Sequence, residues 1–118
     1  MAQPTNSPDR LSVGITAAGD IRLLCPAGEI DHDTGSLLHD ALDTADTARP
    51  RTVVDFSRVT FMDSTGINIL INAHRTHAQA GGWLRLAAPT GSVLRTMQIV
   101  GLDDIIDCRE SLRQALGI

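Results

Sequence analysis

Two short stretches near the start of the chain alternate apolar and polar residues with a period of two. They cover residues 11–16 and 21–25, and the tripeptide 18–20 between them contains Gly19. This pattern predicts two strands joined as an antiparallel hairpin. Pro26 lacks the N–H that an interior strand uses, so we expect the second strand to end there.

Helical spacing marks the next segment, and a continuous apolar run follows it. A helix is predicted to begin near Asp33 or Thr34, which are both good N-caps. Its buried stripe is expected to consist of Leu37, Leu38, Ala41, Leu42 and Ala45. In the run 52–56, the adjacent residues Val53 and Val54 predict a strand that is covered on both faces.

The rest of the chain alternates between helical and strand-like patterns. The elements expected there are a helix from Ser64 to Ala80 that stops at Gly81-Gly82, a strand at 83–87, a helix opening at 89–92, a strand at 105–106 and a final helix carrying Leu112, Ala115 and Leu116. The inward face of the third helix is predicted to be Val93, Leu94, Met97 and Val100. An opening hairpin followed by strand–helix alternation predicts an α/β fold, one mixed β-sheet with flanking helices in the order ββαβαβαβα. We expect residues 1–9 to form a flexible tail and residues 10–118 a single domain.

Composition narrows the class of protein. The chain has 118 residues, 42% of them hydrophobic and only 3% aromatic, which predicts one modest, aliphatic core. Its formal net charge is −4 and its arginines are scattered, so no direct binding of nucleic acid is expected. All ten basic residues are arginine, which excludes a phosphate-binding P-loop, a pyridoxal Schiff base and the lysine of a protein kinase.

The same features predict where the protein works. No apolar run approaches the roughly 20 residues that cross a bilayer, and the polar start at 1–8 does not resemble a signal peptide. We therefore expect a cytoplasmic protein without membrane contact. Cys25 and Cys108 are expected to be buried free thiols.

The strongest candidate for a functional site is Asp63-Ser64-Thr65-Gly66. It precedes an apolar helix, so two hydroxyls lie where unpaired N–H groups and the helix dipole favour negative charge. Three roles are open: a helix cap, a nucleophile and an acceptor of phosphate. One cap suffices for a helix, yet three candidate caps crowd this turn, and Gly66 would leave room for a partner's backbone.

Catalysis and metal binding fit the sequence poorly. A hydrolase elbow needs a glycine two residues before the serine, where this chain has Met62. His74 and His77 lie roughly 15–20 Å along the same helix, and we expect them on its solvated surface. The aspartates and histidines at 31–39 lack the ligand spacing of a calcium loop or a zinc site. We therefore expect no catalytic residue, no metal and no cofactor.

An ordered set of motifs resembles one protein family. Residues 61–66, followed by the apolar helix, are similar to the phosphorylation loop of bacterial anti-sigma factor antagonists, which are single STAS domains. Residues 28–34 resemble the other signature of that family, placed after its second strand. Gly81-Gly82 and Val100-Gly101-Leu102 match further positions, so the resemblance covers about residues 10 to 117.

The resemblance implies regulation of transcription by partner switching in a stress response. In that scheme the unmodified antagonist binds an anti-sigma factor that is also a serine kinase of the histidine-kinase-like ATPase fold, and a sigma factor is released. The kinase phosphorylates the antagonist, which dissociates, and a metal-dependent serine phosphatase restores it. Carried over by motif, the phosphoacceptor is Ser64, with Thr65 as second choice. The implied partner-binding residues are Asp31, His32, Asp63, Thr65, Gly66 and Asn68.

Two other functions stay open at this point. A STAS scaffold or sensor subunit of a larger signalling assembly would keep the fold but should oligomerise. A nucleotide-binding domain belongs to another class of protein, and the missing lysine and missing glycine-rich loop count against it.

Overall fold

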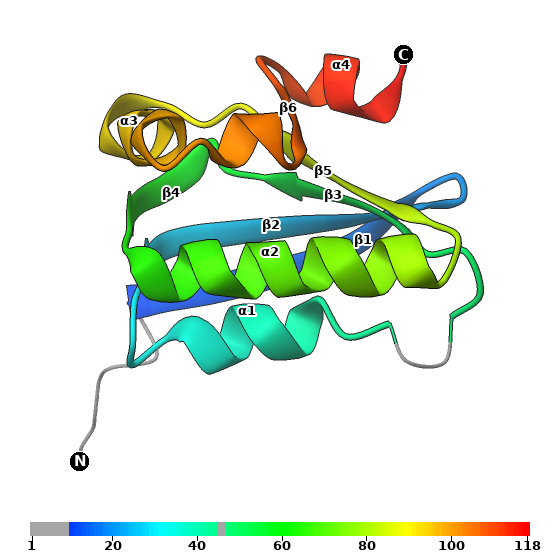
Figure 1. Cartoon of the computed structure of the whole chain (residues 1–118), viewed down its shortest axis with the longest axis horizontal. Helices are drawn as coiled ribbons and strands as arrows, with labels where there is room; N and C mark the ends of the chain where they lie inside the picture. Colours follow the sequence, from blue (N-terminus) through cyan, green and yellow to red (C-terminus); the bar gives the residue numbers. More distant parts are fainter. Residues whose placement is uncertain (1–9, 45–46) are drawn as a thin grey trace.

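A mixed six-stranded β-sheet carries the fold, and the computed structural model describes it in residues 10–44 and 47–118 (Figure 1). The elements in chain order are β1 (Leu11–Ala18), β2 (Ile21–Ile30), α1 (Gly35–Ala41), β3 (Arg51–Asp55), β4 (Arg58–Met62), α2 (Ser64–Gln79), β5 (Trp83–Ala87), α3 (Gly91–Ile99), the 3₁₀ helix η2 (Leu102–Asp104), β6 (Asp107–Arg109) and α4 (Leu112–Leu116). The predicted α/β class is confirmed, with one strand more than the predicted order contains. The predicted tail, residues 1–9, lies outside the described residues.

Strand β2 organises the sheet because it has neighbours along both of its edges. Strand β1 pairs with it antiparallel from Leu11↔Gly28 to Ala18↔Ile21, which confirms the predicted hairpin. On the other edge β2 pairs in parallel with β3 and then with β4, while β5 and β6 extend the sheet beyond β3. The strands that follow β2 are therefore all parallel to it.

Strand β2 is longer than predicted because it continues through Pro26. Its last pair with β3 is Leu24↔Val54 and its first pair with β4 is Ala27↔Arg58. Pro26 thus lies in the interruption between two parallel ladders, where a residue without an N–H is tolerated. The expected end of the strand at Pro26 is wrong.

Strand β4 is missing from the predicted order, and the burial of its side chains does not follow a period of two. Two adjacent residues of β2 pair with Val59 and Phe61, which leaves Thr60 as an extra residue in a bulge. As a result Val59 and Met62, three positions apart, both enter the core. Near the end of the chain, the strand expected at 105–106 is also wrong: Ile106 is a buried core residue, and β6 begins after it.

Helices cover both faces of the sheet. Figure 1 shows α1 and α2 side by side, and α4 on the opposite side. Val54 belongs to the main core beneath α1 and α2, whereas Val53 packs with Ala87 of β5 and Ala115 of α4 in a smaller cluster. Both valines are fully buried, which confirms the prediction of a strand covered on both faces.

The predicted helix faces are correct at their centres and wrong at their flanks. Leu38, Ala41 and Leu42 are buried as expected, and so are Val93 and Met97 of α3. The residues that were expected to be buried but are exposed are Leu37, Leu94 and Val100. Helices α1 and α3 are short and contact the rest of the chain along a narrow stripe, so residues beside that stripe face outward. Ala45 lies outside the described residues.

Candidate functional site

Parallel pairing of β2 and β4 brings the two sequence motifs together. The strands end in register at Ile30↔Met62, and the Asp63 N–H donates to the Ile30 carbonyl at 3.2 Å. The loops that begin at Asp31 and Asp63 therefore leave neighbouring strands at the same end of the sheet (Figure 1). That the two motifs lie side by side depends on β4, the strand that the sequence did not reveal.

Among the three candidate caps of α2, Asp63 performs the capping. Its backbone is extended, and its Oδ1 accepts a hydrogen bond from the Thr65 N–H at 2.9 Å. Ser64 is the first residue of the helix and is exposed. Its hydroxyl is therefore not needed to begin the helix, which leaves it available to another molecule.

Thr65 faces inward by comparison. A Cβ added at Gly35 of the neighbouring helix α1 would lie 2.9 Å from the Thr65 Cγ2, so this methyl group packs against the start of α1. Thr65 is half-buried, whereas Ser64 is exposed. Of the two hydroxyl residues, Ser64 is the one on the surface.

Packing within this chain requires a residue without a side chain at Gly66. A Cβ at this position would lie 2.5 Å from Met62 Cγ and 2.9 Å from Ile30 Cγ2, both in side chains at the strand ends. Gly66 is itself buried. The predicted room for a partner's backbone is therefore filled by this chain, and Gly66 serves packing of α2 on β2 and β4.

The loop after β2 is a tight polar turn closed by Asp31 and Thr34. Asp31 Oδ1 accepts from the N–H groups of Asp33 at 2.9 Å and Thr34 at 3.1 Å. The Thr34 hydroxyl donates to the Glu29 carbonyl at 2.7 Å and accepts from the Asp31 N–H at 2.9 Å. Thr34 is only 5% exposed, so this turn is anchored from beneath.

Arg10 is a site residue that the sequence did not reveal. Its guanidinium forms ion pairs with Asp31, with Glu29 at 3.3 Å and with Asp33 at 3.4 Å. The hairpin register is the signal that predicts this contact, because Leu11 pairs with Gly28 and Arg10 therefore lies beside Glu29. Arg10 thus holds the acidic turn in place from the neighbouring strand.

The exposed part of this site is acidic and carries few apolar groups. In addition to Ser64 it includes His32 with a side chain 95% exposed, exposed Asn68, and half-buried Asp31 and Asp63. We call these five residues the switch surface. Phe61, at the end of β4, is 45% exposed and adds an apolar group from the same strand end.

The histidines of α2 lie away from the switch surface. The prediction that His77 lies on the solvated surface of the helix is wrong. His77 is fully buried, its Nδ1–H donates to the Ala73 carbonyl at 2.7 Å, and its Nε2 lies 2.8 Å from the Thr52 hydroxyl. Burial lowers the pKa of His77, and the charge of Arg22 acts in the same direction. His77 is therefore a neutral core residue that anchors the C-terminal part of α2 to β3.

Other candidate chemistry is weak. Cys25 and Cys108 are free thiols as predicted, but both are half-buried rather than buried. Burial raises the pKa of Cys108 to about 11, and burial also raises the pKa of Cys25, so neither is a reactive thiolate at neutral pH. Within the described part of the chain, no group of three or more His, Cys, Asp or Glu residues could hold a metal ion, and no helix is long and apolar enough to cross a membrane.

Comparison with known sequences identifies related proteins. The family model described as "Mlab, STAS domain" matches residues 15–110. The anti-sigma-B factor antagonist of Listeria monocytogenes is 31% identical over 84 residues, which are 70% of this chain and 74% of that protein. The protein of the same name from Bacillus subtilis is 31% identical over 81 residues, which are 69% of this chain and 74% of that protein.

Solved structures share the fold. An anti-sigma factor antagonist from Mycobacterium paratuberculosis superposes with a TM-score of 0.82 at 24% identity, covering 96% of this chain and 97% of that one. The anti-sigma factor antagonist SpoIIAA in its unphosphorylated form gives a TM-score of 0.68 at 22% identity, covering 91% and 98%. These two likenesses show a common fold. Together with the family model and the sequence relatives, they establish that this chain belongs to the STAS domain family.

Proposed function

We propose that this protein is an anti-sigma factor antagonist that is switched by phosphorylation of Ser64. In its unmodified form it binds an anti-sigma factor that is also a serine kinase of the histidine-kinase-like ATPase fold, and a sigma factor is thereby released. Phosphorylation reverses the binding, and a metal-dependent serine phosphatase restores the unmodified form. The protein is a substrate of these enzymes rather than an enzyme, and it acts in the cytoplasm, where sigma factors work.

The observation that carries the proposal is that two different residues at the start of α2 provide the helix cap and the exposed hydroxyl. Asp63 supplies the cap through its 2.9 Å hydrogen bond to the Thr65 N–H, and Ser64 is exposed beside it. A hydroxyl that is exposed and free of a capping role can enter a kinase active site without unwinding the helix. The names of the sequence relatives, which are anti-sigma-B factor antagonists, support the same function.

The fold should tolerate a phosphate at Ser64. A phosphoserine adds about −1.5 to −2 charge at neutral pH. At the first residue of a helix, the dipole and the unpaired N–H groups stabilise such a charge by about 0.3–1 kcal/mol. This gain offsets part of the repulsion from Asp63, so phosphorylation is not expected to unfold the protein.

The same phosphate should weaken the binding of a partner to this surface. Ser64 is flanked by Asp63 and by the acidic turn at 29–33, where Arg10 faces three carboxylates. A partner that binds this surface must already accommodate negative charge, and a buried phosphate without its own cation adds a desolvation cost of several kcal/mol. About 4 kcal/mol weakens binding a thousandfold, which is sufficient for a switch.

The test is phosphorylation in vitro. The protein is mixed with ATP and the anti-sigma kinases encoded in the same genome, and the modified residue is read from intact and peptide masses. We expect one phosphate on the wild type and none on Ser64→Ala. Thr65→Val is the matched control, because it keeps the methyl group that packs near Gly35 and removes only the hydroxyl; it should still be phosphorylated.

Two results would contradict the proposal in different ways. A phosphate that persists on Ser64→Ala and disappears from Thr65→Val would move the acceptor to Thr65. A protein that no such kinase binds or modifies, and that oligomerises in solution, would instead be a scaffold or sensor subunit.

A further inference from the structure

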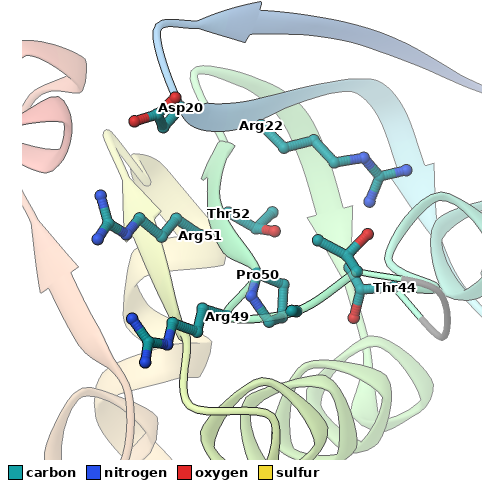
Figure 2. A pocket seen from close by; sticks show the side chains of 9 residues that line it. Asp20, Arg22, Thr44, Arg49, Pro50, Arg51 and Thr52 are labelled. Carbon is teal, nitrogen blue, oxygen red and sulfur yellow. The ribbon is translucent and has the colours of Figure 1, made fainter.

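A second polar feature lies at the other end of the molecule from Ser64. It is a pocket of about 330 Å³, lined by residues from the start of β2, the start of β3 and the connection after α1 (Figure 2). Thr52 lines this pocket and contacts His77, which lies thirteen residues after Ser64 on α2. At 1.5 Å per helical residue the two sites are roughly 20 Å apart along α2, so the pocket is separate from the switch surface.

The pocket is basic although the chain as a whole is acidic. Among the described residues that line it, there are three arginines (Arg22, Arg49 and Arg51) and one carboxylate (Asp20), whereas the formal net charge of the chain is −4. Among residues 10–44 and 47–118, none of these three arginines forms an ion pair. Their combined field therefore attracts anions to this end of the sheet.

Arg22 and Thr44 are the groups best placed to touch a ligand. Figure 2 shows the Arg22 guanidinium reaching toward Thr44, whereas Arg49 and Arg51 extend to the opposite side. Arg22 Nη1 and Thr44 Oγ1 are both buried and have no hydrogen-bond partner among the residues that the structure describes, and Thr44 is only 7% exposed. The Thr52 hydroxyl differs from these two groups, because it already forms a hydrogen bond with His77.

Buried polar groups without a partner are rare in folded proteins, and each needs a physical reason. Here one donor is cationic and the other is a hydroxyl, so both would be satisfied by the oxygen atoms of an anion. A guanidinium presents parallel N–H donors that match two oxygens of one oxyanion, and a threonine hydroxyl can donate to a third. Because both atoms are buried, binding requires side-chain rotations that open these groups to the pocket.

We propose that this pocket binds a tetrahedral oxyanion, phosphate or sulfate, either inorganic or carried on a small molecule. Arg22 and Thr44 contact the oxyanion, and Arg49 and Arg51 add long-range attraction. This site is independent of the phosphorylation of Ser64, because it uses other residues at the other end of α2.

The test is titration of the full chain with inorganic phosphate and with sulfate, followed by calorimetry and by backbone NMR shifts, with chloride keeping the ionic strength constant. We expect saturable binding, with shifts centred on the starts of β2 and β3. Arg22→Gln should weaken binding about tenfold, because a charge-assisted hydrogen bond is lost. Thr44→Val should weaken it about threefold, the effect of losing a neutral hydrogen bond.

Arg51→Gln is the matched control, because it removes the same charge from a side chain that points away from Thr44. It should weaken binding by about twofold at most, the effect of a screened distant charge. Arg22→Lys keeps the charge but loses the fork, so it should bind more weakly than wild type; this variant replaces Arg22→Gln in the test if Arg22→Gln fails to fold. Equal losses in Arg22→Gln and Arg51→Gln, or no saturation with either anion, would overturn the proposal and leave solvent water as the partner of these groups.

Discussion

Ser64 and Asp63 should differ sharply in what they contribute to stability. Asp63 caps α2 through one hydrogen bond of 2.9 Å to the Thr65 N–H, whereas the exposed side chain of Ser64 has no structural role. Losing an aspartate N-cap costs about 1 kcal/mol of unfolding free energy. Surface substitutions without such a role stay within about 0.5 kcal/mol. We therefore expect the free energy of unfolding of Asp63→Ala to be about 1 kcal/mol lower than that of wild type, and that of Ser64→Ala to equal wild type.

Urea unfolding, followed by the fluorescence of the single tryptophan Trp83, measures both effects. Asp63→Asn is the matched control, because asparagine keeps the capping oxygen and loses only the charge near the helix dipole. It should lose no more than about 0.5 kcal/mol. If Ser64→Ala is destabilised as much as Asp63→Ala, then the serine is itself a cap and the proposed separation of cap and switch is wrong.

Three further predictions concern packing, pH and thiol reactivity. Gly66→Ala should lower stability by about 1 kcal/mol, because overpacking against Met62 outweighs the gain in helix propensity; a more stable variant in the same urea assay would show that the strand ends can relax. Burial holds the pKa of His77 below its unfolded value of about 6.5, so the unfolded state binds more protons and stability should fall as pH drops below about 6.5. Unfolding at a series of pH values should show a smaller loss in His77→Leu than in wild type, and an equal loss would assign the pH dependence to other groups. Cys108, with a pKa of about 11, should react with iodoacetamide more slowly at pH 8 than a free model thiol does, and equal rates would contradict its burial.

Local patterns in the sequence carry much of the fold. The fully buried pair Val53 and Val54 identified an interior strand, and helix α2 begins at Ser64 as predicted. Strand β4 is not in the predicted order. Its bulge at Thr60, which depends on the partner strand, buries Val59 and Met62 and leaves Phe61 exposed. Pro26 similarly predicts the end of a strand. Only the structure shows that it lies where β2 stops pairing with β3 and has not yet begun to pair with β4.

The candidate site shows the same limit. The crowd of capping residues at 63–65 could be recognised from sequence, but the choice of Asp63 as the cap depends on the backbone geometry of one turn. Arg10 reaches the acidic turn through strand pairing rather than through proximity in sequence. His77 carries a polar side chain at a helical position that sequence patterns assign to solvent. Its burial is acceptable because Ala73 and Thr52, a distant residue on β3, pair with its two ring nitrogens.

The most direct test of the proposed switch compares the affinity of two forms of the protein for its anti-sigma factor. The protein phosphorylated at Ser64 and the unmodified protein are each titrated with that partner, and the thermal unfolding of both forms is measured alongside. We expect binding to weaken at least about a hundredfold on phosphorylation, which corresponds to roughly 3 kcal/mol, with little change in thermal stability. Equal affinities of the two forms, or a loss of binding that accompanies unfolding of the phosphorylated protein, would contradict a switch that acts at the interface.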